Sequence, residues 1–351
     1  MKKILVINSG STSLKFEIFS LKFKSLKEGY VENIGEDGPP THTAAFEEVI
    51  LAVKKQADLL VIGHRVVHGG EEFKEPTLVT PRVLHRLKKY SRLAPLHNPP
   101  NILGIKLCEK FFPDVPNVAV FDTAFHATIP EKARMYALPF ELAKRFQIKK
   151  YGFHGISHHY VALEAAKKLK KPLSRLNLIT CHLGGGASVA AVKNGYSIDT
   201  SMGFTPTEGL VMMTRCGDID PVIPLFLAKK LNKKPEAIEE ILNEESGVKG
   251  VSGVSDDMLD VLKAARKGNK RAKLAIDIFN YHVKKYISAY YGILGRLDGL
   301  IFTGGIGQNP FFRREICKGL PFLKKVKVLY IPTDEELLIA REAMRCYNKR
   351  I

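Results

Sequence analysis

The sequence lacks the patterns that identify several common classes of protein. No apolar run approaches the roughly 18 residues that a membrane-spanning helix needs. There is no G-x-x-x-x-G-K-[ST] motif, which excludes a P-loop protein, and the H-E-x-x-H pattern of zinc proteases is also missing. The apolar content of 45% is ordinary for a globular protein, and no low-complexity segment or linker is visible. The chemistry must therefore come from other motifs.

Cysteine is scarce and irregularly placed. The five cysteines are odd in number and show no C-x-x-C spacing, which favours reduced thiols over disulfides or a metal site. Only four consecutive apolar residues precede Asn8, fewer than the apolar part of a signal peptide needs. We therefore expect a cytoplasmic protein that opens with a β-strand and has no membrane partner.

Basic residues outnumber acidic residues in this chain. The chain has 36 Asp and Glu residues against 54 Lys and Arg residues, a formal net charge of +18. Such a charge is typical of nucleic-acid-binding proteins. However, the basic runs at 167–171, 229–234 and 263–273 adjoin amphipathic helical patterns and contain no interleaved aromatic residues. We expect a solvated basic surface on a protein that handles small anions rather than a nucleic-acid partner, which stays the last alternative.

Two hairpins rich in glycine or serine occupy corresponding places in the two halves of the chain. The first, at 3–19, and the second, at 178–192, each join two apolar strands through a turn of small residues. Such turns let backbone N–H groups and hydroxyls approach a phosphate closely. Their repetition predicts a duplicated nucleotide-binding fold with the ligand held between the halves.

Strand and helix patterns alternate, which predicts an α/β fold with two domains at 1–149 and 150–332. The last helical pattern begins with three acidic residues, where the helix dipole favours negative charge, and we expect 333–351 to pack back on the first domain. Asp122 follows a buried strand directly. Polar residues at the carboxyl ends of such strands are where α/β sheets meet their ligands.

Several side chains are candidates for chemistry. Arg65 and Arg215 stand apart from the lysine-rich background, and a planar guanidinium suits carboxylates and phosphoryl groups. His154 is flanked by glycines, which would expose it to a ligand. Histidines four residues apart at 64/68 and 154/158 raise the question of zinc, but no cysteine lies at ligand spacing and no H-E-x-x-H is present.

The run Gly304-Gly-Ile-Gly307 follows a predicted strand but lacks the third glycine of a dinucleotide fingerprint. Two interpretations remain open here. The glycines either let an adenosine approach the backbone closely, or they form an ordinary strand-to-helix turn.

Seven motifs together resemble the acetate kinase family, in its order along nearly the whole chain. They are NSGSTSLK (8–15), GHRVVHGG (63–70), LAPLHNPPN (93–101), FDTAFH (121–126), YGFHGISH (151–158), SMGFTPTEG (201–209) and FTGGIGQN (302–309). The resemblance implies two ribonuclease H-like (actin-like) domains with a nucleotide cleft between them. It also implies reversible, direct in-line phosphoryl transfer from ATP to acetate by a homodimer that uses Mg²⁺, with Mn²⁺ as a possible substitute.

The resemblance further implies roles for individual residues. Asn8 and Glu335 would hold the metal ion. The implied catalytic residues are Asp122, Arg65, Arg215 and His154. Arg65 would also bind acetate, whose methyl group would meet Val67, Leu96 and Pro206. The implied nucleotide-binding residues are Lys15, His182, Leu183, Gly184, Gly185, Gly186, Asp257, Met258, Leu259, Gly305, Ile306, Gly307, Gln308 and Asn309.

Four departures from the family pattern affect the nucleotide site. Gly185 replaces an asparagine, Gln308 a glutamate and Leu259 an arginine, and the segment 310–331 is shortened. Two alternatives remain open: a kinase of propionate or butyrate, and a nucleotide-dependent switch without a small acceptor. Because Val67 is not reduced to alanine, the pocket should favour acetate over propionate.

Overall fold

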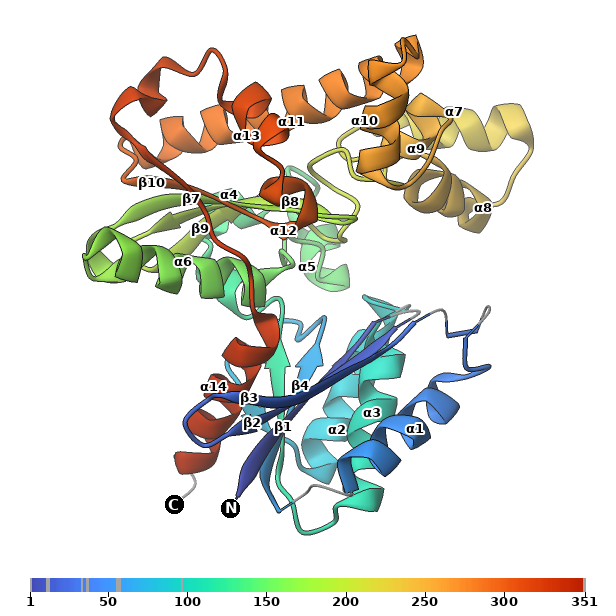
Figure 1. The fold of residues 1–351 in the computed structure, drawn as a ribbon. Coiled ribbons are helices and arrows are strands. Elements are labelled where there is room, and N and C mark those ends of the chain that lie inside the picture. The colour runs from blue at the N-terminus through green and yellow to red at the C-terminus, as the bar shows by residue number, and fades with distance from the viewer. Residues whose placement is uncertain are drawn as a thin grey trace. The chain divides into compact units, whose positions relative to one another are not determined.

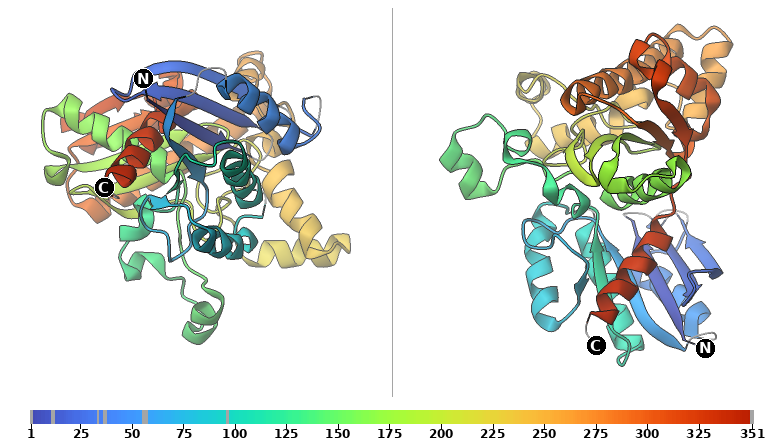
Figure 2. Two further views of the ribbon diagram at one scale, coloured as in Figure 1. Left: turned by 90° about the horizontal axis from the view of Figure 1, so that it is seen from below. Right: turned by 90° about the vertical axis from the view of Figure 1, so that its left-hand side faces the viewer.

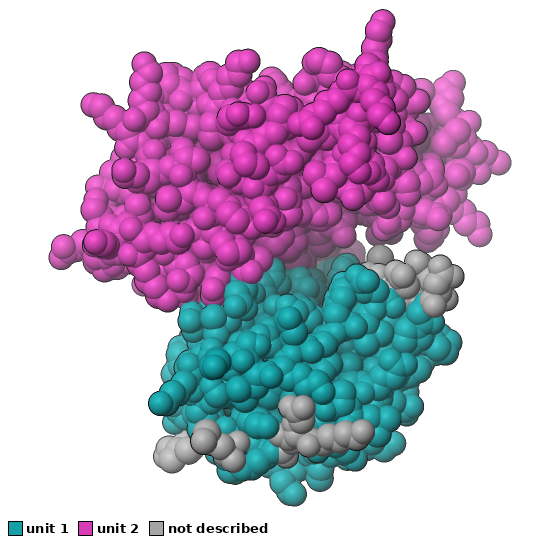
Figure 3. Space-filling model, viewed as in Figure 1, with its two compact units in different colours: residues 1–127, 334–351 teal, residues 128–333 magenta. Residues whose placement is uncertain are grey.

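The computed structural model describes residues 2–10, 13–32, 34–35, 38–54, 58–95 and 97–349. They form two compact units, shown in two colours in Figure 3. Unit 1 combines the chain up to Ala127 with the residues from Asp334 onward, and unit 2 spans Thr128–Thr333. Each unit is built on its own β-sheet.

The sheet of unit 1 has six strands in the order β3-β2-β1-β4-β6-β5. The bounds are β1 (Lys3–Ser9), β2 (Leu14–Ser20), β3 (Ser25–Val31), β4 (Leu59–Val66), β5 (Thr77–Leu78) and β6 (Asn117–Phe121). Strands β1, β4 and β6 run parallel, whereas β2 and β3 extend the sheet as antiparallel hairpins. All residues of β6 are buried, as expected where helices cover both faces of a parallel sheet.

Helices cover both faces of this sheet (Figure 1). They are α1 (His42–Lys54), α2 (Pro81–Lys89), α3 (Asn98–Phe111) and α14 (Glu335–Asn348). Helices α1 and α3 lie on one face and α14 lies on the other. Gly63 in β4 permits the approach of α14, because a Cβ there would lie only 2.8 Å from the Ile339 side chain. The last helix thus packs on the first unit.

The sheet of unit 2 repeats the arrangement of unit 1. Its order is β11-β10-β7-β8-β9, with β7, β10 and β11 parallel and β7, β8 and β9 antiparallel. The bounds are β7 (Asn177–Leu183), β8 (Ala187–Lys193), β9 (Tyr196–Thr200), β10 (Gly299–Thr303) and β11 (Lys327–Tyr330). The predicted duplication of an α/β fold, with a hairpin opening each half, is confirmed.

In unit 2, α6 and α11 cover opposite faces of the sheet (Figures 1 and 2). The helices are α4 (Glu131–Arg134), α5 (Phe140–Phe146), α6 (Gly155–Leu169), α7 (Val222–Leu231), α8 (Pro235–Glu240), α9 (Gly247–Ser252), α10 (Met258–Arg266), α11 (Lys270–Leu294), α12 (Gly304–Gln308) and α13 (Pro310–Cys317). Across the described ranges, no helix is both long and apolar enough to cross a bilayer.

The units divide at Ala127 and Thr128, not at the predicted boundary between residues 149 and 150. The segment 128–149 belongs to unit 2 because its polar groups bond there. The Thr128 hydroxyl donates to the Ser197 carbonyl (2.8 Å), and Tyr136 hydrogen-bonds Glu208. Sequence periodicity could not locate this boundary, since it depends on tertiary hydrogen bonds rather than on a change of pattern.

His64 in β4 couples the stability of unit 1 to pH. Its side chain is 1% exposed, its Nε2 lies 2.7 Å from Asn117 Oδ1, and burial lowers its pKa to about 4. Between pH 6.5 and 4, His64 therefore binds a proton in the unfolded chain but stays unprotonated in the folded chain. We expect this one group to lower the free energy of unfolding by about 3 kcal/mol over that interval.

Urea unfolding at several pH values between 7 and 4 measures this effect. The variant His64→Gln should lose stability less steeply on acidification than the unaltered protein, whatever its stability at pH 7. His85→Gln, at an exposed position of α2, serves as the matched control and should leave the slope unchanged. Equal slopes for all three proteins would contradict the assignment.

Candidate functional site

Three polar residues of unit 1 meet at the carboxyl ends of the parallel strands. Asn8 is near the end of β1, Arg65 near the end of β4, and Asp122 directly follows β6. Arg65 donates from Nε and Nη2 to Asp122 Oδ2, at 3.0 and 2.6 Å, and from Nη1 to Asn8 Oδ1, at 3.1 Å. The guanidinium thus links three strand ends into one cluster.

Helix α14 brings a second carboxylate to this cluster. Glu335 Oε2 lies 3.9 Å from Arg65 Nε. Burial raises the pKa of Glu335, and Arg65 only partly opposes the rise. Burial alone would lower the pKa of Arg65, but Asp122 and Glu335 outweigh it and the net shift is upward. Arg65 is therefore a permanent cation, 19% exposed, between two acids.

The oxygen atoms of this cluster suit a hard divalent cation. Asp122 Oδ1 is buried and has no hydrogen-bond partner among the residues that the structure describes. Asn8 Oδ1 and the Glu335 carboxylate lie beside the same guanidinium. Carboxylate and amide oxygens are the protein ligands that Mg²⁺ prefers, so the donor set fits such an ion.

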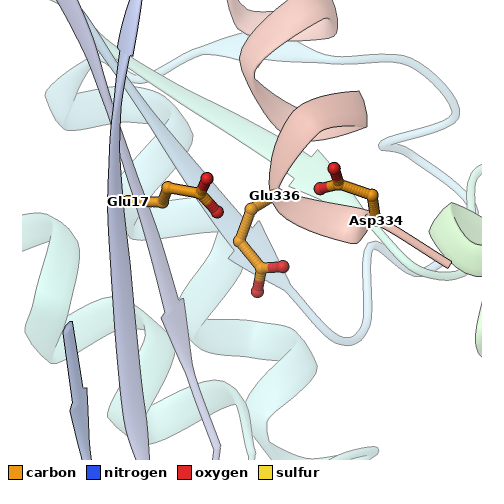
Figure 4. Close-up of side chains that lie close together, drawn as sticks. All are labelled: Glu17, Asp334 and Glu336. Atoms are coloured by element: carbon orange, nitrogen blue, oxygen red, sulfur yellow. The ribbon is translucent and has the colours of Figure 1, made fainter. Parts of the chain in front are cut away.

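A further group of acids lies next to the predicted residues. Glu17, Asp334 and Glu336 each place a carboxylate oxygen within 4.8 Å of the other two (Figure 4). Glu336 also accepts hydrogen bonds from Asn8 Nδ2 (2.9 Å) and Lys15 Nζ (3.1 Å). Burial opposes protonation of Lys15, but Glu336 outweighs it and raises the pKa of the ammonium. Glu336, which the sequence did not single out, therefore holds two of the predicted site residues.

The first hairpin borders an open pocket of about 440 Å³. It is lined by Asn8, Gly10, Ser13, Lys15, Tyr30 and Arg65. The pocket therefore brings the first hairpin, Lys15 and Arg65 to one space within unit 1. Tyr30 was not predicted, and only its position opposite Lys15 in the pairing of β2 with β3 brings it there.

The asparagines of α3 fix the strand ends that carry Arg65 and Asn8. Asn101 Oδ1 accepts the Val67 N–H (3.0 Å), and its Nδ2 donates to the Ser9 carbonyl (2.7 Å). One buried side chain thus joins the ends of β4 and β1. This contact explains why the motif at 93–101 belongs with the site although its asparagines lie in a helix.

In unit 2, two histidines converge on the glycine turn between β7 and β8. His154 has a left-handed backbone (φ 55°) just before α6, and its ring stacks on that of His182 with centroids 4.3 Å apart. A Cβ added to Gly186 would lie 3.3 Å from His154 Nε2 and 3.7 Å from Arg215 Nη1. The predicted residues His154, Arg215, His182 and Gly186 are therefore neighbours.

The loop that carries Arg215 is bonded to the same turn. The Met213 N–H donates to the Gly185 carbonyl (3.2 Å), and the Met212 N–H donates to the Arg215 carbonyl (3.1 Å). Burial lowers the pKa of Arg215, with Glu244 opposing the shift. A cation that is costly to bury is thus held beside a turn suited to anions.

Most of the predicted nucleotide-binding residues line one pocket of about 580 Å³ in unit 2. Its lining consists of Gly184, Gly185, Met213, Asp256, Asp257, Met258, Leu259, Gly305, Ile306, Gln308, Asn309 and Phe312. Leu183 and Gly307 are buried and do not line it. Met213 and Phe312 were missed because apolar residues that line a pocket look like core residues in a sequence, and Asp256 because an exposed aspartate looks like ordinary surface charge.

The residues expected around the acetate methyl group belong to different units. Val67 is 4% exposed in unit 1, Pro206 lies in unit 2, and Leu96 lies outside the described residues. A pocket built from all three stays a prediction.

Comparison with known proteins finds matches that cover nearly the whole chain. The sequence pattern of the acetokinase family matches residues 40–342. An acetate kinase from Dictyoglomus thermophilum is 48% identical over an alignment of 398 positions, covering 99% of this chain and 100% of the relative. This alignment exceeds the 351 residues of the chain, so the relative has residues without a counterpart here.

Two solved structures share the fold. An acetate kinase from Porphyromonas gingivalis has a TM-score of 0.91 at 38% identity, covering 99% of this chain and all of that one. A propionate kinase from Francisella tularensis has a TM-score of 0.92 at 40% identity, covering 98% and 100%. The expected pair of actin-like domains is thereby confirmed.

Adjacent glycines at the rim of the unit 2 pocket should respond differently to alanine. Gly304 has φ 78°, and a Cβ there would lie 2.5 Å from the Leu183 carbonyl oxygen, whereas no atom of the described residues lies within 4 Å of a Cβ on Gly305. We expect Gly304→Ala to lower the free energy of unfolding by about 2 kcal/mol. Gly305→Ala, the matched control, should change it by less than about 0.5 kcal/mol. Equal losses in urea unfolding would refute this reading of the turn.

Proposed function

The chain belongs to the acetokinase family, and on that premise we propose that it transfers the γ-phosphoryl group of ATP reversibly to acetate, forming acetyl phosphate and ADP. The cluster in which Arg65 joins Asn8 and Asp122 is the observation that supports the proposal most. It gathers a cation and oxygen donors at one set of strand ends, where an anionic acceptor and a metal–nucleotide can both be held.

The reaction needs alignment and charge neutralisation more than proton transfer. An ionised carboxylate is already a nucleophile at neutral pH, so no general base is required. In the proposed step an acetate oxygen forms a bond to the γ-phosphorus as the bond to the β,γ-bridging oxygen breaks, and ADP leaves with that electron pair. Arg65, Arg215 and the Nε2 side of His154 would offset the charge of the two anions, and Asp122 would orient Arg65.

We propose Mg²⁺ as the cofactor, with Asn8 and Glu335 as its protein ligands and Mn²⁺ as a substitute. When bound, such an ion withdraws charge from the β- and γ-phosphate oxygens. Lys15 would lie near the phosphates, and the unit 2 pocket would receive the adenosine. The ammonium of Lys15 is held by Glu336, so its position is set before any nucleotide arrives.

Propionate is the second candidate acceptor, because one similar structure is a propionate kinase. One methylene in an apolar pocket discriminates by only about 1–3 kcal/mol, so a preference for acetate should be graded rather than absolute.

A homodimer is also proposed. Helix α7 buries none of its side chains and exposes Val222, Leu225 and Phe226 by 62%, 70% and 55%, which is typical of a surface covered by a partner. Sedimentation velocity would distinguish dimer from monomer. The cytoplasmic location expected from the cysteines remains a prediction.

The direct test is acetyl phosphate formation from ATP with acetate, propionate and butyrate, with and without Mg²⁺. We expect the highest kcat/KM with acetate, a value about 10-fold or more lower with propionate, and little product when Mg²⁺ is removed. ATP hydrolysis that is independent of all three acids would instead support a switch ATPase.

The two arginines should matter for turnover more than for nucleotide binding. We expect Arg65→Ala and Arg215→Ala each to lower kcat by about 10³-fold, because each leaves phosphoryl charge uncompensated, while Kd for ATP changes by less than about 10-fold. Arg296→Ala removes a side chain that is 63% exposed and is the matched control. Near-normal turnover of both site variants would show that the arginine assignment is wrong.

A further inference from the structure

A chain of buried hydrogen bonds ends on His154. Thr180 Oγ1 in β7 lies 2.7 Å from His158 Nδ1, and His158 Nε2 lies 2.8 Å from Ser188 Oγ in β8. Ser188 Oγ in turn lies 2.9 Å from His154 Nδ1. Thr180, His158 and Ser188 are all 0% exposed. The three side chains are therefore withdrawn from bulk water, and His154 stands at the end of the chain nearest the glycine turn.

While both rings are neutral, two arrangements let Ser188 donate to one of the two histidines; a third, in which Ser188 accepts from both, leaves its buried proton without an acceptor among the described residues, which is costly. In the first, Thr180 donates to His158, His158 donates to Ser188, and Ser188 donates to His154 Nδ1, which leaves the His154 proton on Nε2. In the second, every bond is reversed and His154 Nε2 carries a lone pair.

Thr180 selects between the two arrangements. The His158 ring is the only side-chain hydrogen-bond partner of Thr180 Oγ1 in the described part of the chain. In the second arrangement the Thr180 hydroxyl accepts, and no described residue offers an acceptor, backbone or side chain, for its own buried proton, which is costly. The first arrangement is therefore favoured, and His154 carries its proton on Nε2.

The neighbouring histidine is held in the same way. His182 Nδ1 lies 2.7 Å from Ser157 Oγ, which is 0% exposed and, among the described residues, bonds no other side chain. As a donor to Nδ1, Ser157 leaves the His182 proton on Nε2. A Cβ added to Gly184 would lie 3.8 Å from His182 Nε2, so this nitrogen also borders the glycine turn.

We propose that the buried hydroxyls of Thr180, Ser188 and Ser157 fix His154 and His182 as two neutral Nε2–H donors directed at the turn of residues 184–186. The importance of these donors rests on the proposed function, in which this turn meets phosphoryl oxygens. A lone pair on Nε2 would repel such an oxygen, whereas an N–H attracts it. Neutral rings also suit the 4.3 Å stack, because two imidazolium cations at that separation would repel each other. Thr180, Ser188, Ser157 and His158 act here as positioning residues.

The tautomers can be read directly by NMR of the full-length enzyme labelled with ¹⁵N in its histidine rings. At pH 7.5 we expect His154 and His182 each to show a protonated Nε2 and an unprotonated Nδ1. The variants His154→Gln and His182→Gln assign the two signals. A proton on Nδ1 of His154, or a doubly protonated His154 ring, would overturn the proposal. This reading does not depend on activity, so the absence of acetyl phosphate formation would refute the proposed function separately.

Substitution of Thr180 tests the chain without touching the glycine turn. In Thr180→Val we expect a mixture of His154 tautomers. We expect kcat to fall by about 2- to 10-fold, because His154 Nε2 then carries a proton in only a fraction of the molecules. Thr180→Ser keeps the hydroxyl and should keep the tautomers of the unaltered enzyme. Thr200→Val removes a hydroxyl from another fully buried position of the same sheet, which bonds the Val189 carbonyl instead, and is the matched control. Identical spectra for Thr180→Val and Thr200→Val would refute the role of Thr180.

Discussion

The confinement of one arginine between two acids is the constraint on which unit 1 depends. Asp122 and Glu335 approach the same guanidinium from β6 and α14, and Arg65 itself comes from β4. Without the cation, these carboxylates would lie close together in a poorly solvated place. Removing one partner of a buried ion pair typically costs several kcal/mol. Arg65 therefore links strand ends, the start of α14 and the local charge balance, and the proposed chemistry uses it too.

The two units contribute different kinds of group. Unit 1 supplies carboxylates, an amide oxygen and the cations Arg65 and Lys15, a set suited to a metal ion and an acid. Unit 2 supplies N–H donors around a glycine turn and a largely apolar pocket, a set suited to phosphates and a nucleoside. The same sheet topology thus carries two complementary chemistries, which differ in the side chains placed beyond the strand ends.

The sequence was informative wherever chain geometry alone determines proximity. Asn8 came only from the resemblance to the family and Arg65 from its guanidinium chemistry, but Asp122 could be placed at a ligand-binding sheet edge because it directly follows a buried strand. Glu336 could not, since three acids at the start of a helix look like partners of the helix dipole. Only the packing of α14 turns Glu336 toward Asn8. Ser188 and Thr180 were equally hidden, because small hydroxyl residues are common in buried strands and their partners lie on another element.

The discontinuity of unit 1 along the chain has a consequence for how the protein is made. Helix α14 covers one face of the first sheet, yet the ribosome must complete the whole of unit 2 before residues 335–348 are available. During synthesis that face of the sheet stays uncovered until α14 is made, and until then Arg65 lacks its contact with Glu335. Glu335, the acid proposed to hold the metal, is thus among the last site residues to be synthesised. The proposed metal site can therefore be completed only near the end of synthesis.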